Sequence, residues 1–302
     1  MIDFTVIILT CNEERHVERC IRSIQNIASR VVVVDSFSLD RTVEIARSMK
    51  ADVVQRKFLN QADQIQWALD NLKIDTQWIM RMDADEYLEP DLIAEIQQKL
   101  PSIPLDVNGI YIRRKVFFQG QWIRHGGVYP YTVLRIWRAG QGRIEQRWMD
   151  EHVVLPPNAK TVMFKGHIVD DNLKGITFWV EKHNRYASRE MAQILIQKYF
   201  TGQGDRALRD MTTDPQARRK RVIKEEIYNK LPPGIRAALY FFYRYILLLG
   251  FLDGGKGFIY HFLQGFWYRF LVDVKVLEVE KNAKGDIQRI REILRNEHGI
   301  EL

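Results

Sequence analysis

The stretch WIMRMDADE, residues 78–86, joins a short apolar run to two carboxylates, Asp83 and Asp85. The apolar run predicts a buried strand, and the carboxylates fall where that strand would leave its sheet. Two carboxylates at this spacing can turn toward one hard cation. So few oxygen ligands suit Mg²⁺ or Mn²⁺, which complete their shell with water and substrate phosphates. A solvated turn is the alternative, because Asp-x-Asp also occurs in loops without a metal.

The sequence before this stretch repeats one plan three times. Apolar runs that predict strands alternate with segments of helical pattern, at residues 4–9, 15–27, 31–34, 43–49, 52–54 and 62–72. Continuous apolar strands that alternate with helices predict a parallel sheet covered on both faces. The first hundred residues are therefore expected to form an α/β fold.

Polar residues gather at or just after the ends of the predicted strands. These residues are Thr10, Asn12, Glu13, Asp35, Asp83 and Asp85. Ligands of parallel α/β sheets bind beyond the carboxyl ends of the strands, so this shared position favours a metal site over a solvated turn. For Thr10 and Glu13 an ordinary helix start with an acidic first turn remains an alternative. The chain has no Gly-x-Gly-x-x-Gly and no phosphate loop, so metal and cationic side chains must meet phosphate charge.

Three ordered motifs carry a resemblance to a known family. They are the Thr-x-Asn-Glu run at 10–13, the acidic and hydroxyl run at 35–42, and the Asp-x-Asp strand end at 83–85. In this order they resemble family 2 glycosyltransferases of the GT-A fold, whose Rossmann-like, mostly parallel sheet is flanked by helices. The resemblance implies a nucleotide-sugar donor.

The resemblance also implies roles for single residues. Thr10 and Asp35 would border the uracil or ribose, Asp83 would face the ribose, and Asp85 would hold Mg²⁺ or Mn²⁺ across the diphosphate. The nucleotide-sugar contacts that it implies are Thr10, Asn12, Glu13, Asp35, Gln64 and Asp83.

Sugar transfer with inversion needs a base that takes the proton from the acceptor hydroxyl. Residues 147–153 offer Asp150 and Glu151 beside His152. In the family the second acid is usually the base, which implies Glu151, while Asp150 would bind the acceptor or orient the base. His152 could bind diphosphate or metal or serve the structure alone. His167, expected after a short strand, resembles the late histidine that some GT-A enzymes return to the metal.

Cations are concentrated in the C-terminal half of this 302-residue chain, whose net charge is +7. Lys182 and Arg185 share the face of a predicted helix and could receive the diphosphate or an acidic acceptor, although a solvated basic face is the commoner outcome. No nucleic-acid-binding signature accompanies the charge, so an anionic membrane surface is the expected partner rather than nucleic acid. The N-terminus lacks a basic leader with an apolar core, which predicts a cytoplasmic protein.

Residues 240–270 hold 13 of the 34 aromatic residues. Residues 235–252 are nearly long enough to span a bilayer, but Arg244 near their centre would cost about 2.5–3.5 kcal/mol. We therefore expect two helices joined at 253–256 that lie in the membrane interface. A re-entrant hairpin, two ordinary core helices, or a homo-oligomer contact are the alternatives.

The segments at 182–186, 250–254 and 266–270 resemble one bacterial branch of the family, the lipopolysaccharide-core β-1,4-glucosyltransferases with related capsule and exopolysaccharide enzymes. This resemblance implies inverting, metal-dependent hexose transfer from a UDP-sugar to a lipid-linked glycan, by a protein peripheral on the cytoplasmic face of the inner membrane. A polyprenyl-phosphate acceptor is an alternative. A nucleotidyltransferase is a weaker one, because it would usually carry a glycine-rich basic loop after its first strand.

These observations predict four regions. Residues 1–175 would form the GT-A catalytic domain, with a nucleotide-sugar half at 1–100 and an acceptor half at 101–175. A basic helical region would follow at 176–230, then the aromatic membrane-associating helices at 231–276 and a tail helix at 277–302.

Overall fold

The computed structural model describes residues 2–145, 152–200 and 231–300. Their contacts divide the chain into two compact units. The first unit comprises residues 1–124, 128–146 and 151–173, and the second comprises 125–127, 147–150 and 174–302. Glu151, the predicted base, and Asp150, its predicted partner, lie outside the described residues, as do the basic residues of 201–230.

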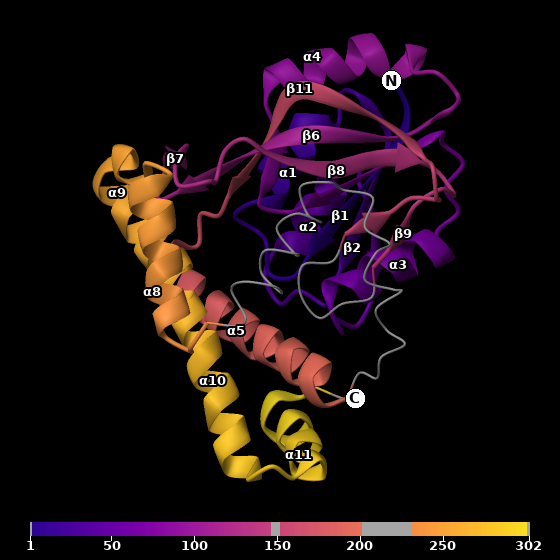
Figure 1. The fold of residues 1–302 in the computed structure, drawn as a ribbon. Helices are drawn as coiled ribbons and strands as arrows, with labels where there is room; N and C mark the ends of the chain where they lie inside the picture. Colours follow the sequence, from indigo (N-terminus) through magenta and orange to yellow (C-terminus); the bar gives the residue numbers. More distant parts are fainter. Residues whose placement is uncertain (1, 146–151, 201–230, 301–302) are drawn as a thin grey trace. The chain divides into compact units, whose positions relative to one another are not determined.

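The first unit is built on one large sheet (Figure 1). Its strand order is β3 (Asp52–Gln55), β2 (Ala28–Asp35), β1 (Ile2–Thr10), β4 (Trp78–Asp83), β8 (Tyr131–Arg138), β6 (Val107–Phe118), β11 (Lys160–Asp171) and β5 (Glu86–Leu88), with β7 (Gln121–Ile123) paired to β6. β9 (Arg143–Ile144) and β10 (Val153–Val154) form a separate pair. The half from β3 to β4 is wholly parallel, whereas β8 runs antiparallel to both of its neighbours. The predicted α/β fold with a parallel nucleotide-side sheet is confirmed.

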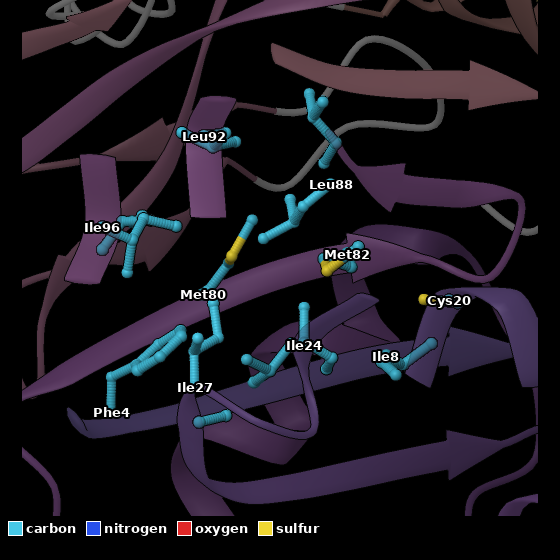
Figure 2. Close-up of a cluster of buried hydrophobic side chains, with 14 of the residues drawn as sticks. Phe4, Ile8, Cys20, Ile24, Ile27, Met80, Met82, Leu88, Leu92 and Ile96 are labelled. Carbon is cyan, nitrogen blue, oxygen red and sulfur yellow. The ribbon is translucent and has the colours of Figure 1, made fainter. Parts of the chain in front are cut away.

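Side chains of β1 alternate between the two faces of the sheet, as the pleat of a strand requires. Phe4, Val6 and Ile8 join one buried cluster with α1 (Val17–Ile24), α2 (Thr42–Ser48) and α4 (Pro90–Lys99), part of which Figure 2 shows. Ile7 and Leu9 join a second cluster with α3 (Gln61–Asn71). A short 3₁₀ turn, η1 (Leu100–Ser102), follows α4. The sheet is thus covered on both sides, which leaves its carboxyl edge for polar chemistry.

The second unit is helical. It contains α5 (Gly175–Tyr199), α8 (Ile235–Phe242), the π-helical η4 (Tyr243–Leu247), the 3₁₀ turn η5 (Gly250–Asp253), α9 (Gly254–Tyr260), the π-helical η6 (His261–Trp267), α10 (Tyr268–Ala283) and α11 (Ile287–His298). Residues of α5, α10 and α11 share a buried apolar core. Among the described residues no single helix is both long and apolar enough to cross a bilayer, whereas Ile235–Leu247 and Gly250–Ala283 pass together as a pair bent by 72°.

The break between the aromatic helices lies earlier than the predicted 253–256. The chain leaves its first helical arm at Leu248 and Leu249, and Leu249 adopts a left-handed φ of 59°. The second helical arm begins at Gly254, directly after the buried Asp253. The glycines at 254 and 255 therefore lie in the first turn of a helix rather than in the joint.

Candidate active site

Thr10 and Asp35 are the last residues of β1 and β2, and they are register partners. The Thr10 hydroxyl donates to Asp35 Oδ1 at 2.9 Å, and both side chains are buried. Asp35 also accepts from the Ser38 backbone N–H at 2.9 Å and from the Gln55 amide at 3.2 Å. These donors fix the carboxylate in one orientation at the sheet edge. A carboxylate held this way is suited to orient a ligand.

Asn12 and Glu13 organise the turn that follows β1. Asn12 has a left-handed φ of 56°, and its side-chain oxygen accepts from the Leu39 backbone N–H at 2.7 Å. Glu13 Oε2 lies 2.6 Å from Nδ1 of the fully buried His16, whose Nε2 accepts from the Leu173 backbone N–H at 2.8 Å. Because Nε2 is an acceptor, the ring proton of neutral His16 resides on Nδ1 and is donated to Glu13. Glu13 thereby ties the turn to the end of β11.

Asp83 ends β4 in register with Leu9, so it lies one strand away from Thr10 and two from Asp35. Its two carboxylate oxygens lie near cations, Oδ1 at 3.5 Å from Arg81 and Oδ2 at 3.4 Å from Arg135. Asp85 follows in the turn before β5, and its Oδ2 accepts from the Asn172 amide at 3.0 Å. Both carboxylates are partly accessible, so the strand-end pair is available to a ligand at the sheet edge.

A buried ion pair stabilises the turn between β4 and β5. Glu86 Oε1 pairs with the Arg135 guanidinium, and both side chains are buried. The second oxygen, Oε2, accepts from the Asp83 backbone N–H at 2.9 Å. Burial raises the pKa of Glu86 to about 7; the positive charge of Arg135 opposes this rise, and the carboxylates of Asp83 and Asp170 add to it. Glu86 and Arg135 therefore hold the backbone and the carboxylate of Asp83 in place.

The end of β11 contributes residues that the sequence patterns did not identify. The Asp171 backbone N–H donates to Asp85 O at 3.1 Å, and Arg19 pairs with the Asp171 carboxylate at 2.6 Å. Asn172 comes next and contacts the Asp85 carboxylate. The signal that could have found them is the run Asp170-Asp171-Asn172, since polar residues at a strand end marked the other site residues. These contacts bring an amide to the carboxylate pair.

His167 does not follow a short strand, as was expected, but lies inside the long strand β11 and not beside Asp85; its role at the metal stays a prediction. β11 continues through it to Asp171, because it pairs with β6 on one side and β5 on the other. Asp171 is the residue opposite Asp85, so His167 lies about 13 Å away along the strand at roughly 3.3 Å per residue. Its Nδ1 contacts Asp91 at 2.5 Å, and its Nε2 contacts the Tyr129 hydroxyl at 2.9 Å.

Within the described part of the chain, Glu89, Asp91 and His167 are close enough to share a cation, with ligand atoms within 4.8 Å of one another. However, the Lys115 ammonium already contacts Glu89 at 2.5 Å. A fixed cation at this position competes with a metal ion. We therefore assign the trio to the support of α4 and β11.

The remaining predicted residues have structural contacts of their own. His152 and Glu145 lie next to the β9–β10 pair, with His152 Nδ1 3.5 Å from the Glu145 carboxylate, and the role of His152 at the metal stays a prediction. Gln64 is buried, and its amide donates to Val34 O at 2.9 Å and to the Ser36 hydroxyl at 2.8 Å. This commits the Gln64 amide to the end of β2. Lys182 and Arg185 lie on α5 of the second unit, and their contact with a donor stays a prediction.

Carboxylates and an amide at the carboxyl edge of a sheet, with one parallel and one mixed half, are the arrangement expected of the GT-A class of α/β proteins. Residues 5–168 match the family model described as glycosyl transferase family 2, so the chain belongs to this family. The resemblance seen in the three sequence motifs is thereby confirmed.

Relatives with curated descriptions match parts of the chain. An uncharacterized glycosyltransferase of Rickettsia bellii is 46% identical over 90 residues, which are 30% of this chain and 30% of that protein. The matched region thus spans about a third of the length of such relatives. The lipopolysaccharide core biosynthesis glycosyltransferase LpsC of Rhizobium meliloti is 26% identical over 198 residues, covering 62% of this chain and 69% of that protein.

Among solved structures, this chain is similar to glucosyl-3-phosphoglycerate synthase of Mycobacterium tuberculosis, in complex with Mn²⁺, UDP and glucosyl-3-phosphoglycerate. The similar region covers 38% of this chain and 44% of the synthase chain. The identity is 18% and the TM-score 0.31.

Proposed function

We propose that this protein transfers a hexose from a UDP-sugar to a lipid-linked glycan, with inversion and with a divalent cation, at the cytoplasmic face of the inner membrane. The observation that carries the proposal is the row formed by Asp35, Thr10 and Asp83 at the ends of three adjacent strands, with Asp85 in the next turn. Ligands of open α/β sheets, nucleotides among them, bind outside the carboxyl ends of the strands, where this row of oriented polar groups lies. The family match and the relative described for lipopolysaccharide core biosynthesis support the reaction class.

The donor set at the sheet edge fits a hard cation. Asp83 and Asp85 supply carboxylate oxygens, and Asn172 supplies an amide beside Asp85. All-oxygen donors without thiolate suit Mg²⁺ or Mn²⁺. A bound cation would supply positive charge for the leaving diphosphate. Asp85 would hold it, and Asp83 would contact the ribose or share the cation.

The remaining roles belong to side chains of the protein. Thr10 and Asp35 orient the nucleoside, and Arg135 keeps Asp83 in position. Glu151 takes the proton from the acceptor hydroxyl, with Asp150 as the alternative base. Lys182 and Arg185 receive negative charge of the donor or acceptor.

The test is a titration of UDP with and without Mn²⁺, followed by a screen of UDP-hexoses for hydrolysis and for protection against heat. Binding that strengthens with Mn²⁺, together with one protecting donor, supports the proposal. Binding to polyanions that weakens with salt and ignores Mn²⁺ would remove it. Transfer to a lipid-linked glycan rather than to polyprenyl phosphate then separates the two acceptor classes.

A further inference from the structure

The hairpin, residues 235–270, carries large apolar side chains on its outside. Thirteen of the 24 large apolar side chains that are exposed in the described part of the chain belong to it. On the first arm they recur at helical spacing, as Leu239, Phe242, Tyr243 and Ile246. Large exposed apolar patches on soluble proteins mark sites that contact a partner or a membrane, so this concentration of exposed apolar side chains calls for such an explanation.

Four phenylalanines form a ladder along the second arm of the hairpin. The ring centroids of Phe258 and Phe262 are 6.1 Å apart, those of Phe262 and Phe266 5.5 Å, and those of Phe266 and Phe270 5.7 Å. Phe241 of the first arm meets Phe258 and Phe262 edge-on, at 6.3 and 6.1 Å. The two arms therefore share one aromatic surface, about 18 Å long at a helical rise of roughly 1.5 Å per residue.

The polar side chains of the hairpin lie on its inside. Arg244 and Asp253 are each 6% exposed and His261 is fully buried, whereas Lys256 is exposed. The Arg244 guanidinium donates hydrogen bonds to the Gln264 side chain and to Gly126 O, so it has hydrogen-bond partners within the protein. A pair of helices that is apolar outside and polar inside is the inverse of a water-soluble pair. Because the Arg244 side chain is buried inside the hairpin, it does not prevent the outer face of the hairpin from contacting lipid.

One side of the hairpin is covered by the strap, residues His125–Gly127. The Gly126 backbone N–H donates to Leu248 O at 2.8 Å, and Arg244 Nε donates to Gly126 O at 2.8 Å. The His125 backbone N–H and ring contact Asp253 at 2.9 and 2.7 Å. A Cβ at Gly126 would come within 2.1 Å of the His261 ring, so glycine is needed for this close approach. The polar backbone of the strap is thus hydrogen-bonded to the turn of the hairpin.

We propose that the hairpin lies flat in the interface of a phospholipid bilayer, with the phenylalanine ladder and the outer stripe of α8 against the acyl chains. The strap, with its polar backbone, makes the turn unsuited to be the deepest point of insertion. The arm Ile235–Leu247 is also too short to cross, since 13 residues span about 20 Å and the hydrocarbon core is about 30 Å. This inference rests on the proposed function, for which it names the membrane orientation.

The orientation favours anionic headgroups. Lys256 is exposed beside the aromatic surface, and the chain as a whole carries a net charge of +7. Cations that lie at the level of the headgroups strengthen the binding of amphipathic helices to anionic lipid. Vesicles of phosphatidylcholine with phosphatidylglycerol are therefore the probe.

The experiment places an environment-sensitive fluorophore at single cysteines and measures its depth with lipids that are spin-labelled at shallow or deep positions. The variants are Phe242→Cys, Phe262→Cys, Phe270→Cys and Leu252→Cys in a Cys11→Ser background, with Asn71→Cys on exposed α3 surface as the control. Cys20 stays in place, since burial raises the pKa of its thiol well above the ordinary value and makes it unreactive.

We expect the fluorophores at positions 242, 262 and 270 to lie at the same shallow depth, and the fluorophore at position 252 to lie no deeper. Deeper quenching at 252 overturns the flat orientation in favour of insertion turn-first. No quenching at any position overturns membrane contact. As a second measurement, Phe258→Ser with Phe262→Ser should lower vesicle co-sedimentation several-fold, whereas Phe58→Ser on the first unit should not. UDP binding with Mn²⁺ is followed on the same samples, so failure of the hairpin and failure of the proposed function are distinguishable.

Discussion

The Asn172 amide donates a 3.0 Å hydrogen bond to Asp85 Oδ2, which links the first residue after β11 to the acidic turn after β4. The two residues are 87 positions apart in the sequence. They meet because β11 pairs with β5, which begins directly after Asp85. The Asn172 amide can therefore hold the Asp85 carboxylate, the candidate metal ligand, in place.

Asn172→Ala should weaken Mn²⁺ binding in the presence of UDP roughly tenfold to a hundredfold, because partners of metal-binding carboxylates set their orientation. Isothermal titration with Mn²⁺ measures this. Asn71→Ala, an exposed asparagine on α3, is the matched control. Equal Mn²⁺ affinity in all three proteins would show that Asn172 does not position Asp85.

Asp85→Ala should abolish the enhancement of UDP binding by Mn²⁺ and lower hexose transfer by about a hundredfold or more. The fold should survive, since the Asp85 side chain is not part of the core. Asp75→Ala, which removes an exposed carboxylate, should change neither quantity. Wild-type transfer by the Asp85 variant would remove the metal from the mechanism.

Arg135→Met should destabilise the protein by about 3–5 kcal/mol, because it leaves the buried Glu86 carboxylate without its partner. Arg135→Met combined with Glu86→Leu should recover part of that loss. Urea denaturation of the single and double variants measures the coupling. For comparison, Arg22→Met breaks an exposed pair with Glu18 and should cost less than about 1 kcal/mol.

Glu151→Gln should retain UDP binding and lose transfer, since it removes the proposed base and leaves the donor site intact. Asp150→Asn is the paired variant, and the slower of the two in single-turnover transfer identifies the base. If neither change slows the chemical step, the base is a residue of another segment.

Acid should destabilise the second unit through His183 on α5. The pKa of this imidazole is lowered to about 4, chiefly by burial and to a smaller extent by the charge of Lys182, while a hydrogen bond to Trp179 O opposes the shift. The unfolded chain, with a histidine pKa of about 6.5, then takes up a proton that the folded protein does not, so stability falls as pH drops from 6.5 to 4. Thermal denaturation of His183→Phe, which keeps a ring against Trp179, should show a smaller loss over this range than the wild type.

The parallel half of the fold was predictable because its strands and helices leave short-range patterns. The runs at 4–9 and 31–34 became β1 and β2, and their end residues Thr10 and Asp35 indeed meet. The strand around His167 was predicted too short, and this error has a different origin. The length of β11 depends on its pairing with β5 and β6, and such pairing between distant segments leaves no periodic signal. The polar run Asp170-Asp171-Asn172 marks a strand end, but the contact between Asn172 and Asp85 arises from the pairing of β11 with β5, which that run does not reveal.

The strap has a practical implication for biochemists who wish to divide the molecule. A shorter polypeptide that stops at Leu173 would retain residues 125–127 yet lack Leu248, Asp253 and His261, against which they pack. Such a fragment would leave a glycine-rich loop unsupported between β7 and β8. A soluble sheet fragment for crystallisation therefore needs a redesigned connection across 125–127 as well as the removal of everything that follows 173.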